Sequence, residues 1–155
     1  MKRLPLSLVG LTAFSGGAAL VTWFVVGPPD RSVPCDPGNL PENHVCLATV
    51  REWEAADVLW VDARPRDYWE RDGIEGAILV NDQEEWMVME EPFVLAVFGD
   101  GSHLKSKVVV YCNQSGCSSS TYVADRLREK HGEALGFDVY VLHGGVKAFA
   151  EEVGN

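Results

Sequence analysis

Four short apolar segments constrain the fold of this chain more than any other feature of its sequence. They are rich in β-branched and aromatic side chains and cover residues 58–62, 77–80, 107–111 and 138–142. Runs of this length and composition predict strands that are buried on both faces of a sheet. The remaining segments predict helices at 65–71, 82–98 (interrupted at Pro92), 118–131 and 146–153. This alternation predicts an α/β fold, in which a central, mainly parallel sheet lies between two layers of helices.

The carboxyl ends of the strands are where a parallel α/β sheet usually carries its functional groups. Polar or reactive residues follow two of the predicted strands, at 62–64 and at Cys112. In the helix expected after Cys112, the side chains of Tyr122, Val123 and Leu127 recur at helical spacing. We therefore expect these three side chains on the buried face of that helix.

The loop after Cys112 carries the most information about function. A loop between a buried strand and a helix N-terminus can direct backbone N–H groups inward, where they stabilise an anion. The same surroundings should lower the pKa of the Cys112 thiol and favour its thiolate. We expect Cys112 to be a nucleophile and Cys117 to be a second reactive thiol. The anion cradle would then be formed by Asn113, Gln114, Ser115, Gly116 and Ser118. The alternatives are a buried structural thiol for Cys112 and a small loop residue without a chemical role for Cys117.

Three segments together resemble the rhodanese family of sulfurtransferases, over about residues 47–154. The first holds Val61-Asp62-Ala63-Arg64-Pro65 and Gly73-Ile74-Glu75-Gly76-Ala77, the second is Val109-Val110-Tyr111-Cys112, and the third is Val139-Tyr140-Val141-Leu142-His143-Gly144-Gly145. The resemblance implies a rhodanese-like fold and a sulfurtransferase. Cys112 would accept a sulfane sulfur, form a persulfide and pass the sulfur to a thiol acceptor. We expect no cofactor and no metal.

The sequence departs from the family pattern at several positions. Gly73 stands where the family has a histidine, and Val146 stands where an aromatic residue often follows the double glycine. Cys117 occupies a loop position that is often basic, so we expect weak activity on thiosulfate or a different sulfur donor. Phosphatase relatives of this fold need an arginine at the position of Ser118, which disfavours phosphatase or arsenate-reductase activity by that mechanism.

Cys117 suggests a second chemistry. Its thiol could attack a persulfide on Cys112, release sulfide and close a disulfide. The same two cysteines could instead form a thiol–disulfide redox pair without sulfur transfer, and a non-catalytic binding module is a third hypothesis. Closure requires that the two Cα atoms lie about 4.4–6.8 Å apart.

The other polar candidates are expected to have structural roles. For Asp62 and Arg64 we expect a supporting ion pair or hydrogen bonds to neighbouring loops, and the alternative is a direct contact with the substrate. Cys35 and Cys46 flank ten residues ahead of the domain, and in an oxidising compartment they would form a structural disulfide. The cysteine spacing fits a zinc site poorly, and no metal spacing joins His44, His103, His131 and His143.

The N-terminal segment differs in kind from the rest of the chain. Lys2 and Arg3 precede an uncharged stretch from Leu4 to Val26. A helix of that length would reach about 34 Å, enough to cross a hydrocarbon core of about 30 Å. We expect an uncleaved transmembrane anchor at 1–27, a Pro-rich linker at 28–44 and the rhodanese-like domain at 45–155. The basic residues would place the domain in the periplasm or outside the cell. The alternative is a protein secreted after signal-peptide cleavage, although no clear cleavage site follows Val26.

The charge balance limits the partners. A formal net charge of -10 and the lack of a Lys/Arg cluster argue against nucleic-acid binding. We expect the partners to be a small sulfur-donor anion or persulfide, a thiol acceptor, and the membrane through the N-terminal helix.

Overall fold

The computed structural model describes residues 35–99, 101, 104–114 and 116–149. The expected anchor at 1–27 and the linker as far as Pro34 lie outside these residues, as do His103, Ser115 and the end of the last expected helix. Within the described ranges, no helix combines the length and the apolar character that a bilayer crossing needs.

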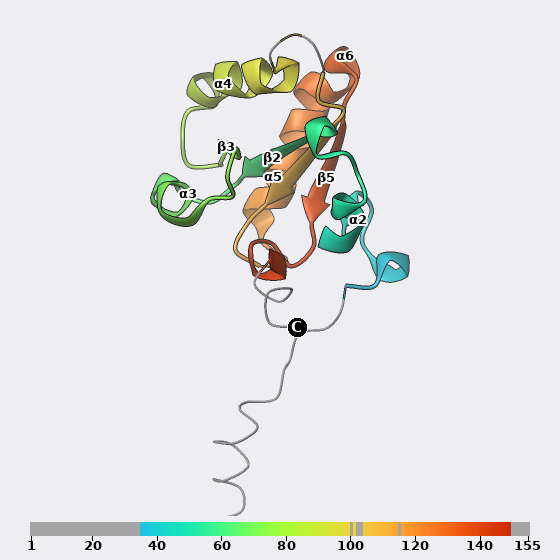
Figure 1. Cartoon of the computed structure of the whole chain (residues 1–155). Helices are drawn as coiled ribbons and strands as arrows, with labels where there is room; N and C mark the ends of the chain where they lie inside the picture. Colours follow the sequence, from blue (N-terminus) through green and yellow to red (C-terminus); the bar gives the residue numbers. More distant parts are fainter. Residues whose placement is uncertain (1–34, 100, 102–103, 115, 150–155) are drawn as a thin grey trace, which may run out of the picture. The chain divides into compact units, whose positions relative to one another are not determined.

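Strands and helices alternate along the described chain (Figure 1). In order, the elements are η1 (Pro37–Asn39), β1 (His44–Val45), α2 (Leu47–Arg51), η2 (Ala55–Asp57), β2 (Val58–Asp62), α3 (Arg66–Asp72), β3 (Ile78–Leu79), α4 (Trp86–Phe98), β4 (Lys107–Tyr111), α5 (Ser118–Leu127), the π-helical turn η3 (Arg128–Gly132), α6 (Glu133–Leu135) and β5 (Asp138–Leu142). The strands form one sheet in the order β1-β5-β4-β2-β3, and every pairing is parallel. The predicted α/β fold with a parallel sheet is therefore confirmed.

The core has two halves, one on each face of the sheet, because successive strand residues point to opposite faces. One half joins Val61, Val110 and Val141 to residues of α4 and α5 that include Phe93, Val123 and Leu127. The other half joins Val109, Tyr111 and Leu142 to Leu47 and Val50 of α2 and to the segment 146–149. Strands β2, β4 and β5 are thus covered on both sides, which explains why they read as continuous apolar runs.

Helix α4 corrects two predictions. It begins at Trp86 rather than at residue 82, because Asn81 Oδ1 accepts the N–H groups of Gln83 and Glu84 and holds a loop there. The helix also continues through Pro92, where the sequence predicted an interruption. Pro92 is exposed, so water can satisfy the carbonyl that loses its N–H partner. Phe93 and Val97, both fully buried, hold the following turns against the sheet.

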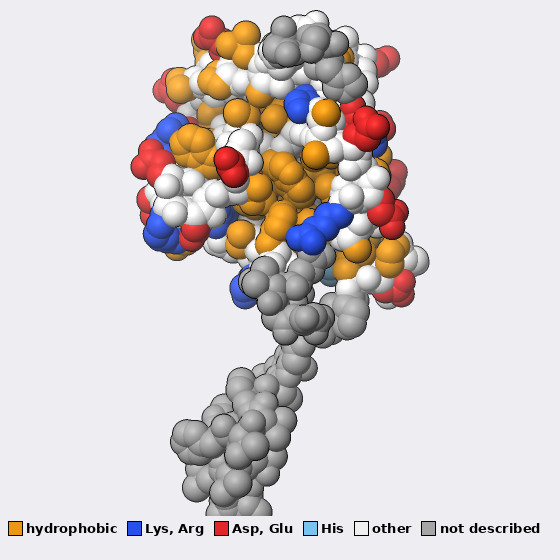
Figure 2. Space-filling view, viewed as in Figure 1, with side chains coloured by type: hydrophobic (Ala, Val, Ile, Leu, Met, Phe, Trp, Pro, Cys, Tyr) orange, Lys and Arg blue, Asp and Glu red, His pale blue; other side chains and the backbone are white. Residues whose placement is uncertain are grey.

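The outer surface of α4 is also apolar. Large exposed side chains on it are Met87, Val88, Leu95 and Phe98. Figure 2 shows hydrophobic side chains reaching the surface in this part of the molecule. Because α4 is apolar on both its buried and its exposed side, its sequence periodicity does not reveal which face packs on the sheet.

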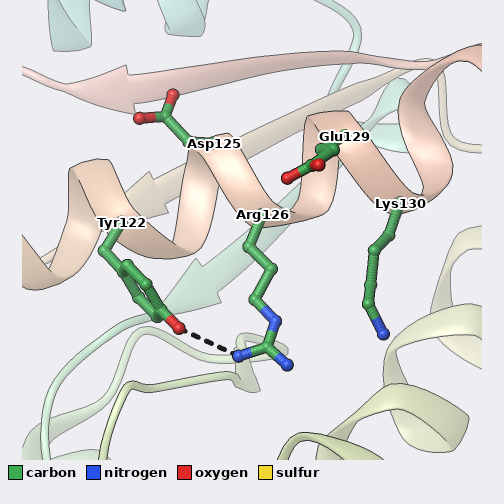
Figure 3. A pocket seen from close by; sticks show the side chains of 5 residues that line it. All are labelled: Tyr122, Asp125, Arg126, Glu129 and Lys130. Atoms are coloured by element: carbon green, nitrogen blue, oxygen red, sulfur yellow. Dashed lines mark hydrogen bonds between the residues drawn. The ribbon is translucent and has the colours of Figure 1, made fainter.

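The prediction that Tyr122 is buried is wrong. Its side chain is 49% exposed, and its hydroxyl accepts a hydrogen bond from Arg126 Nη1 at 2.9 Å (Figure 3). Val123 and Leu127 are buried as predicted, and Ser120 and Ala124 complete the buried stripe of α5. Tyr122 lies one position from that stripe, and one helical residue is a rotation of about 100°.

The first strand and helix of the domain had no counterpart among the predicted elements. Strand β1 is only two residues long and pairs with β5, His44 opposite Val141 and Val45 opposite Leu142. Cys46 follows it, is 2% exposed, and forms a disulfide with Cys35 across a Cα separation of 5.7 Å. This bond ties the segment before β1 to the start of α2.

Candidate active site

Cys112 lies at the carboxyl edge of the sheet, directly after the middle strand β4. The neighbouring strand β2 ends in register with it, since Asp62 pairs with Tyr111 and the Ala63 N–H donates to the Tyr111 carbonyl oxygen at 2.9 Å. The Cys112 residue is 6% exposed. The structure thus places the predicted nucleophile at the edge where parallel sheets carry their functional groups.

The loop from Cys112 leads directly into α5. Gly116 takes a positive φ of 74°, and Cys117 is the N-cap residue of α5. Ser120 Oγ donates to the Cys117 carbonyl oxygen at 3.0 Å and closes the first turn. Asn113, Gln114, Gly116 and Ser118 are exposed at the loop surface.

Several backbone N–H groups of this loop are candidate donors to a bound anion. Within the described residues, no acceptor is found for the backbone N–H groups of Asn113, Gln114, Gly116 and Cys117. These groups are the donors that an anion cradle requires. That they converge on one anion stays a prediction.

The structure brings Cys112 and Cys117 together. They form a disulfide, and their Cα atoms lie 6.3 Å apart. This separation falls within the range that a disulfide tolerates, which the sequence alone could not establish. The two thiols can therefore react with each other without a rearrangement of the fold.

A second loop packs on the back of the Cys112 loop. It is the turn after β5, in which the Val146 N–H donates to the Cys112 carbonyl oxygen at 2.7 Å. Gly145 has a positive φ of 58°, and a Cβ atom built on it would lie 2.4 Å from that same oxygen and 2.7 Å from the Gln114 nitrogen. Only a glycine allows this approach, so the double-glycine turn holds the backbone of residues 112–114.

Asp62 and Arg64 form a buried ion pair beneath this edge. Arg64 is 1% exposed and Asp62 is 0% exposed. Arg64 Nη2 donates to Asp62 Oδ2 at 2.8 Å, Arg64 Nε donates to Asp62 Oδ1 at 3.0 Å, and Arg64 Nη1 donates to Asp72 Oδ1 at 2.8 Å. Burial opposes the charge of the guanidinium, but its hydrogen bonds to Asp62 and the Asp62 charge outweigh burial and raise the pKa of Arg64. Arg64 stays charged and fully engaged, so it supports the strand ends rather than reaching a substrate.

Tyr111 connects this ion pair to the segment before β3. Its hydroxyl accepts the Ile74 N–H at 3.0 Å. Burial, together with Asp62, raises the pKa of Tyr111, so the phenol keeps its proton. The neighbouring Gly73 explains the missing histidine. A Cβ at this position would lie 2.5 Å from the Trp69 carbonyl oxygen, so the present backbone excludes any larger residue there.

Sequence reasoning missed two charged groups beside the loop. Lys147, three residues after Gly144, donates from Nζ to Gln114 Oε1 at 3.3 Å. Asp82 Oδ2 accepts a hydrogen bond from Ser119 Oγ at 3.0 Å, in the first turn of α5. Neither contact could be read from spacing, because Lys147 and Asp82 belong to other segments of the chain. The double-glycine turn before Lys147 was the one signal available.

Other surface features of the described residues do not compete with this site. The groove in Figure 3 is lined by Tyr122, Asp125, Arg126, Glu129 and Lys130, and it holds no cysteine and no residue of the Cys112 loop. Within the described ranges, no group of three or more His, Cys, Asp or Glu side chains has the geometry of a metal site.

Comparisons with known proteins agree with the fold. The family model of the rhodanese-like domain matches residues 49–152. Among solved structures, the chain is similar to the N-terminal domain of a Clostridium difficile 630 protein that has been proposed to bind ATP or GTP. The TM-score is 0.50 at 20% identity, and the match covers 72% of this chain and 99% of that one. The BH2092 protein from Bacillus halodurans matches with a TM-score of 0.46 at 18% identity, covering 71% of this chain and 72% of that one. At 20% identity the likeness to the Clostridium difficile domain concerns the fold alone. No match was found among curated proteins.

Proposed function

Because the chain belongs to the family of rhodanese-like domains, we propose that it is a sulfurtransferase that carries sulfane sulfur as a persulfide on Cys112. The observation that carries the proposal is the position of Cys112. It follows the middle strand at the carboxyl edge of the sheet, between two packed loops, with a second thiol within bonding distance. A thiolate in such a place has the anion-stabilising surroundings that a persulfide also needs.

The reaction is a pair of thiolate displacements. The Cys112 thiolate attacks the sulfane sulfur of the donor, the Cys112 Sγ–sulfur bond forms, and the donor's S–S bond breaks. With thiosulfate the leaving group is sulfite, which takes the bonding electron pair. A thiol acceptor then attacks the outer sulfur as its thiolate, and Cys112 leaves as a thiolate again.

Cys117 supplies an alternative second step. Its thiolate attacks Cys112 Sγ of the persulfide, the bond to the outer sulfur breaks, and hydrosulfide leaves. The product is the Cys112–Cys117 disulfide, the bond that the structure contains. A thiol reductant must then open this disulfide before the next cycle.

The disulfide also favours a second candidate function. Cys112 and Cys117 would be a dithiol pair that exchanges with a partner's thiols without any sulfur loading. In that case Cys117, which is more exposed than Cys112, is the sulfur that an incoming thiolate reaches first.

We place the domain outside the cytoplasm, held at the membrane by residues 1–27. The Cys35–Cys46 disulfide, which has no part in the proposed reaction, supports an oxidising compartment, since structural disulfides are rare in the cytosol. The partners are a sulfur donor and a thiol acceptor, and the acidic chain is not expected to bind nucleic acid. Alkaline extraction of membranes tests the anchor, because a peripheral protein would be released and an anchored one would remain.

Intact-mass spectrometry of the full chain tests the sulfur-carrier proposal. The protein is reduced, freed of reductant and exposed to thiosulfate or to polysulfide. Wild type is compared with Cys112→Ser and Cys117→Ser. We expect a gain of about 32 Da, one sulfur atom, on Cys117→Ser and none on Cys112→Ser, because the thiolate of Cys112 is the nucleophile.

The wild type separates the two candidate functions. If Cys117 resolves the persulfide, the wild type should lose two hydrogens and release sulfide after donor addition. The redox pair would remain as the function under two conditions. An oxidised thiol partner would have to convert the wild type to the Cys112–Cys117 disulfide, and no variant would gain sulfur from any donor.

A further inference from the structure

The Cys112 loop has no positive charge of its own. From Cys112 to Ser120 the sequence contains no lysine or arginine. Arg64, the buried cation at this sheet edge, is 1% exposed and is fully engaged with Asp62 and Asp72. An anionic donor that approaches the Cys112 thiolate would therefore meet like charge with only backbone N–H groups to offset it.

The turn after β5 is fixed against this loop. The Val146 N–H donates to the Cys112 carbonyl oxygen at 2.7 Å, and the space at Gly145 is filled by the backbone of residues 112–114. Because Lys147 follows these two residues directly, its backbone has a defined position relative to Cys112. From this position the Lys147 side chain reaches the loop, where its Nζ contacts Gln114 Oε1.

The Lys147 ammonium lies at the loop surface, where its partner among the described residues is a neutral side chain. Its Nζ donates to Gln114 Oε1 at 3.3 Å, and the side chain is exposed. Among the described residues, the structure gives Lys147 no carboxylate partner. A neutral amide such as that of Gln114 is a weak competitor for an ammonium group, so a bound anion can take its place.

We propose that Lys147 binds the anionic group of the sulfur donor beside Cys112 and makes the site selective for anionic donors over uncharged ones. This inference rests on the proposed function and identifies its donor class. With thiosulfate, negative charge accumulates on the departing sulfite oxygens as the S–S bond breaks, and Lys147 stabilises that charge. The expectation of weak thiosulfate activity or a different sulfur donor counted only the residues of the loop, and Lys147 would add the cation that the loop lacks.

The test compares an anionic and an uncharged electrophile on the same thiol. All proteins carry Cys117→Ser, so that Cys112 cannot form its disulfide. The anionic probe is thiosulfate, scored by persulfide mass. The uncharged probe is methyl methanethiosulfonate, which transfers its methylthio group to the thiolate and releases methanesulfinate. The full chain with Cys117→Ser alone is compared with three variants that also carry Lys147→Met, Lys147→Arg or Lys105→Met.

Lys105 provides the matched control. It precedes β4, at the opposite end of that strand from Cys112, and it donates to the Ala56 carbonyl oxygen. We expect Lys147→Met to slow thiosulfate loading about three- to fivefold, the upper part of the range for one exposed ion pair, and to change the uncharged reaction by less than about twofold. Lys147→Arg should retain most of the thiosulfate rate, and Lys105→Met should retain nearly all of it.

Two results would overturn the inference. One is that Lys147→Met slows both probes equally or neither probe. The other is that thiosulfate fails to load Cys112 even with Lys147 present. Loading by polysulfide distinguishes the two proposals. If polysulfide still forms the Cys112 persulfide, only the role of Lys147 is refuted. If no donor forms it, the proposed function is refuted as well.

Discussion

Replacement of Gly145 by alanine tests whether the turn after β5 holds the Cys112 loop. Gly145 has a φ of 58°, a conformation that costs an alanine about 1–2 kcal/mol. The new Cβ would also meet the Cys112 oxygen at 2.4 Å, the Gln114 nitrogen at 2.7 Å and the Asn113 carbonyl carbon at 3.0 Å. All three are backbone atoms, so the collision cannot be relieved by a rotamer change and the loop must move.

Gly136 offers a matched control for the conformational cost alone. Its φ is 70°, but an added Cβ would meet nothing within 4 Å. Gly136→Ala should therefore cost about 1–2 kcal/mol, and Gly145→Ala about 2–5 kcal/mol once overpacking of about 1–3 kcal/mol is included. At roughly 4 °C per kcal/mol for a domain of this size, the melting temperature should fall by about 4–8 °C and about 8–20 °C respectively.

The assay is calorimetry of the oxidised full chain, followed by persulfide loading of the reduced protein well below both melting temperatures. Displacement of residues 112–114 should slow loading by about tenfold or more in Gly145→Ala, because reacting groups must be held to within about an ångström. Gly136→Ala should load at the wild-type rate. Equal melting temperatures in the two variants, with normal loading in Gly145→Ala, would refute the claim that this turn positions the loop.

Three further outcomes follow from the structure. Asp62→Asn removes the buried partner of Arg64 and should lower the free energy of unfolding by about 3–5 kcal/mol in chemical denaturation, whereas a loss under about 1 kcal/mol would contradict the structural role of the pair. The hydrogen bond from Arg66 lowers the pKa of Glu84 in the folded protein. Wild type should therefore be more stable than Glu84→Gln, and this advantage should be complete above the ordinary glutamate pKa. It should vanish as the pH falls through the lower pKa of the folded state. Denaturation at a series of pH values checks this, and an advantage that is constant with pH would count against it. Cys35→Ser removes a disulfide with a sequence separation of 11 and should lower the free energy of unfolding by about 3 kcal/mol, measured as a lower melting temperature. An unchanged melting temperature would show that the bond does not constrain the unfolded chain.

The longer strands could be predicted because their pattern is local. Strands β2, β4 and β5 are covered by side chains on both faces, so each reads as an unbroken apolar run. Strand β1 could not be found in this way, because two residues have no period and His44–Val45 becomes a strand only by pairing with β5. The start of α4 was missed for a related reason: the Asn81 side chain captures two N–H groups that a helix would otherwise use.

The residues of the candidate site also differ in whether the sequence alone could predict them. Cys112 could be identified from sequence because a reactive residue directly after a buried strand lies at the functional edge of the sheet whatever the rest of the chain does. The supporting role of Asp62 and Arg64 was predicted from their position at the end of a buried strand. Lys147 could not be found, since its contact with Gln114 spans 33 positions and depends on the pairing of β4 with β5.

The sequence by itself determined the α/β class and the parallel strands and predicted a nucleophile, because each depends on neighbours along the chain. Only the tertiary structure decided that Cys112 and Cys117 lie within disulfide distance, that Arg64 is closed off from the surface, and that Lys147 brings a positive charge to a loop that has none. These three features depend on loop conformation and strand register, which set the distances between side chains that are far apart in the chain and leave no periodic trace in the sequence.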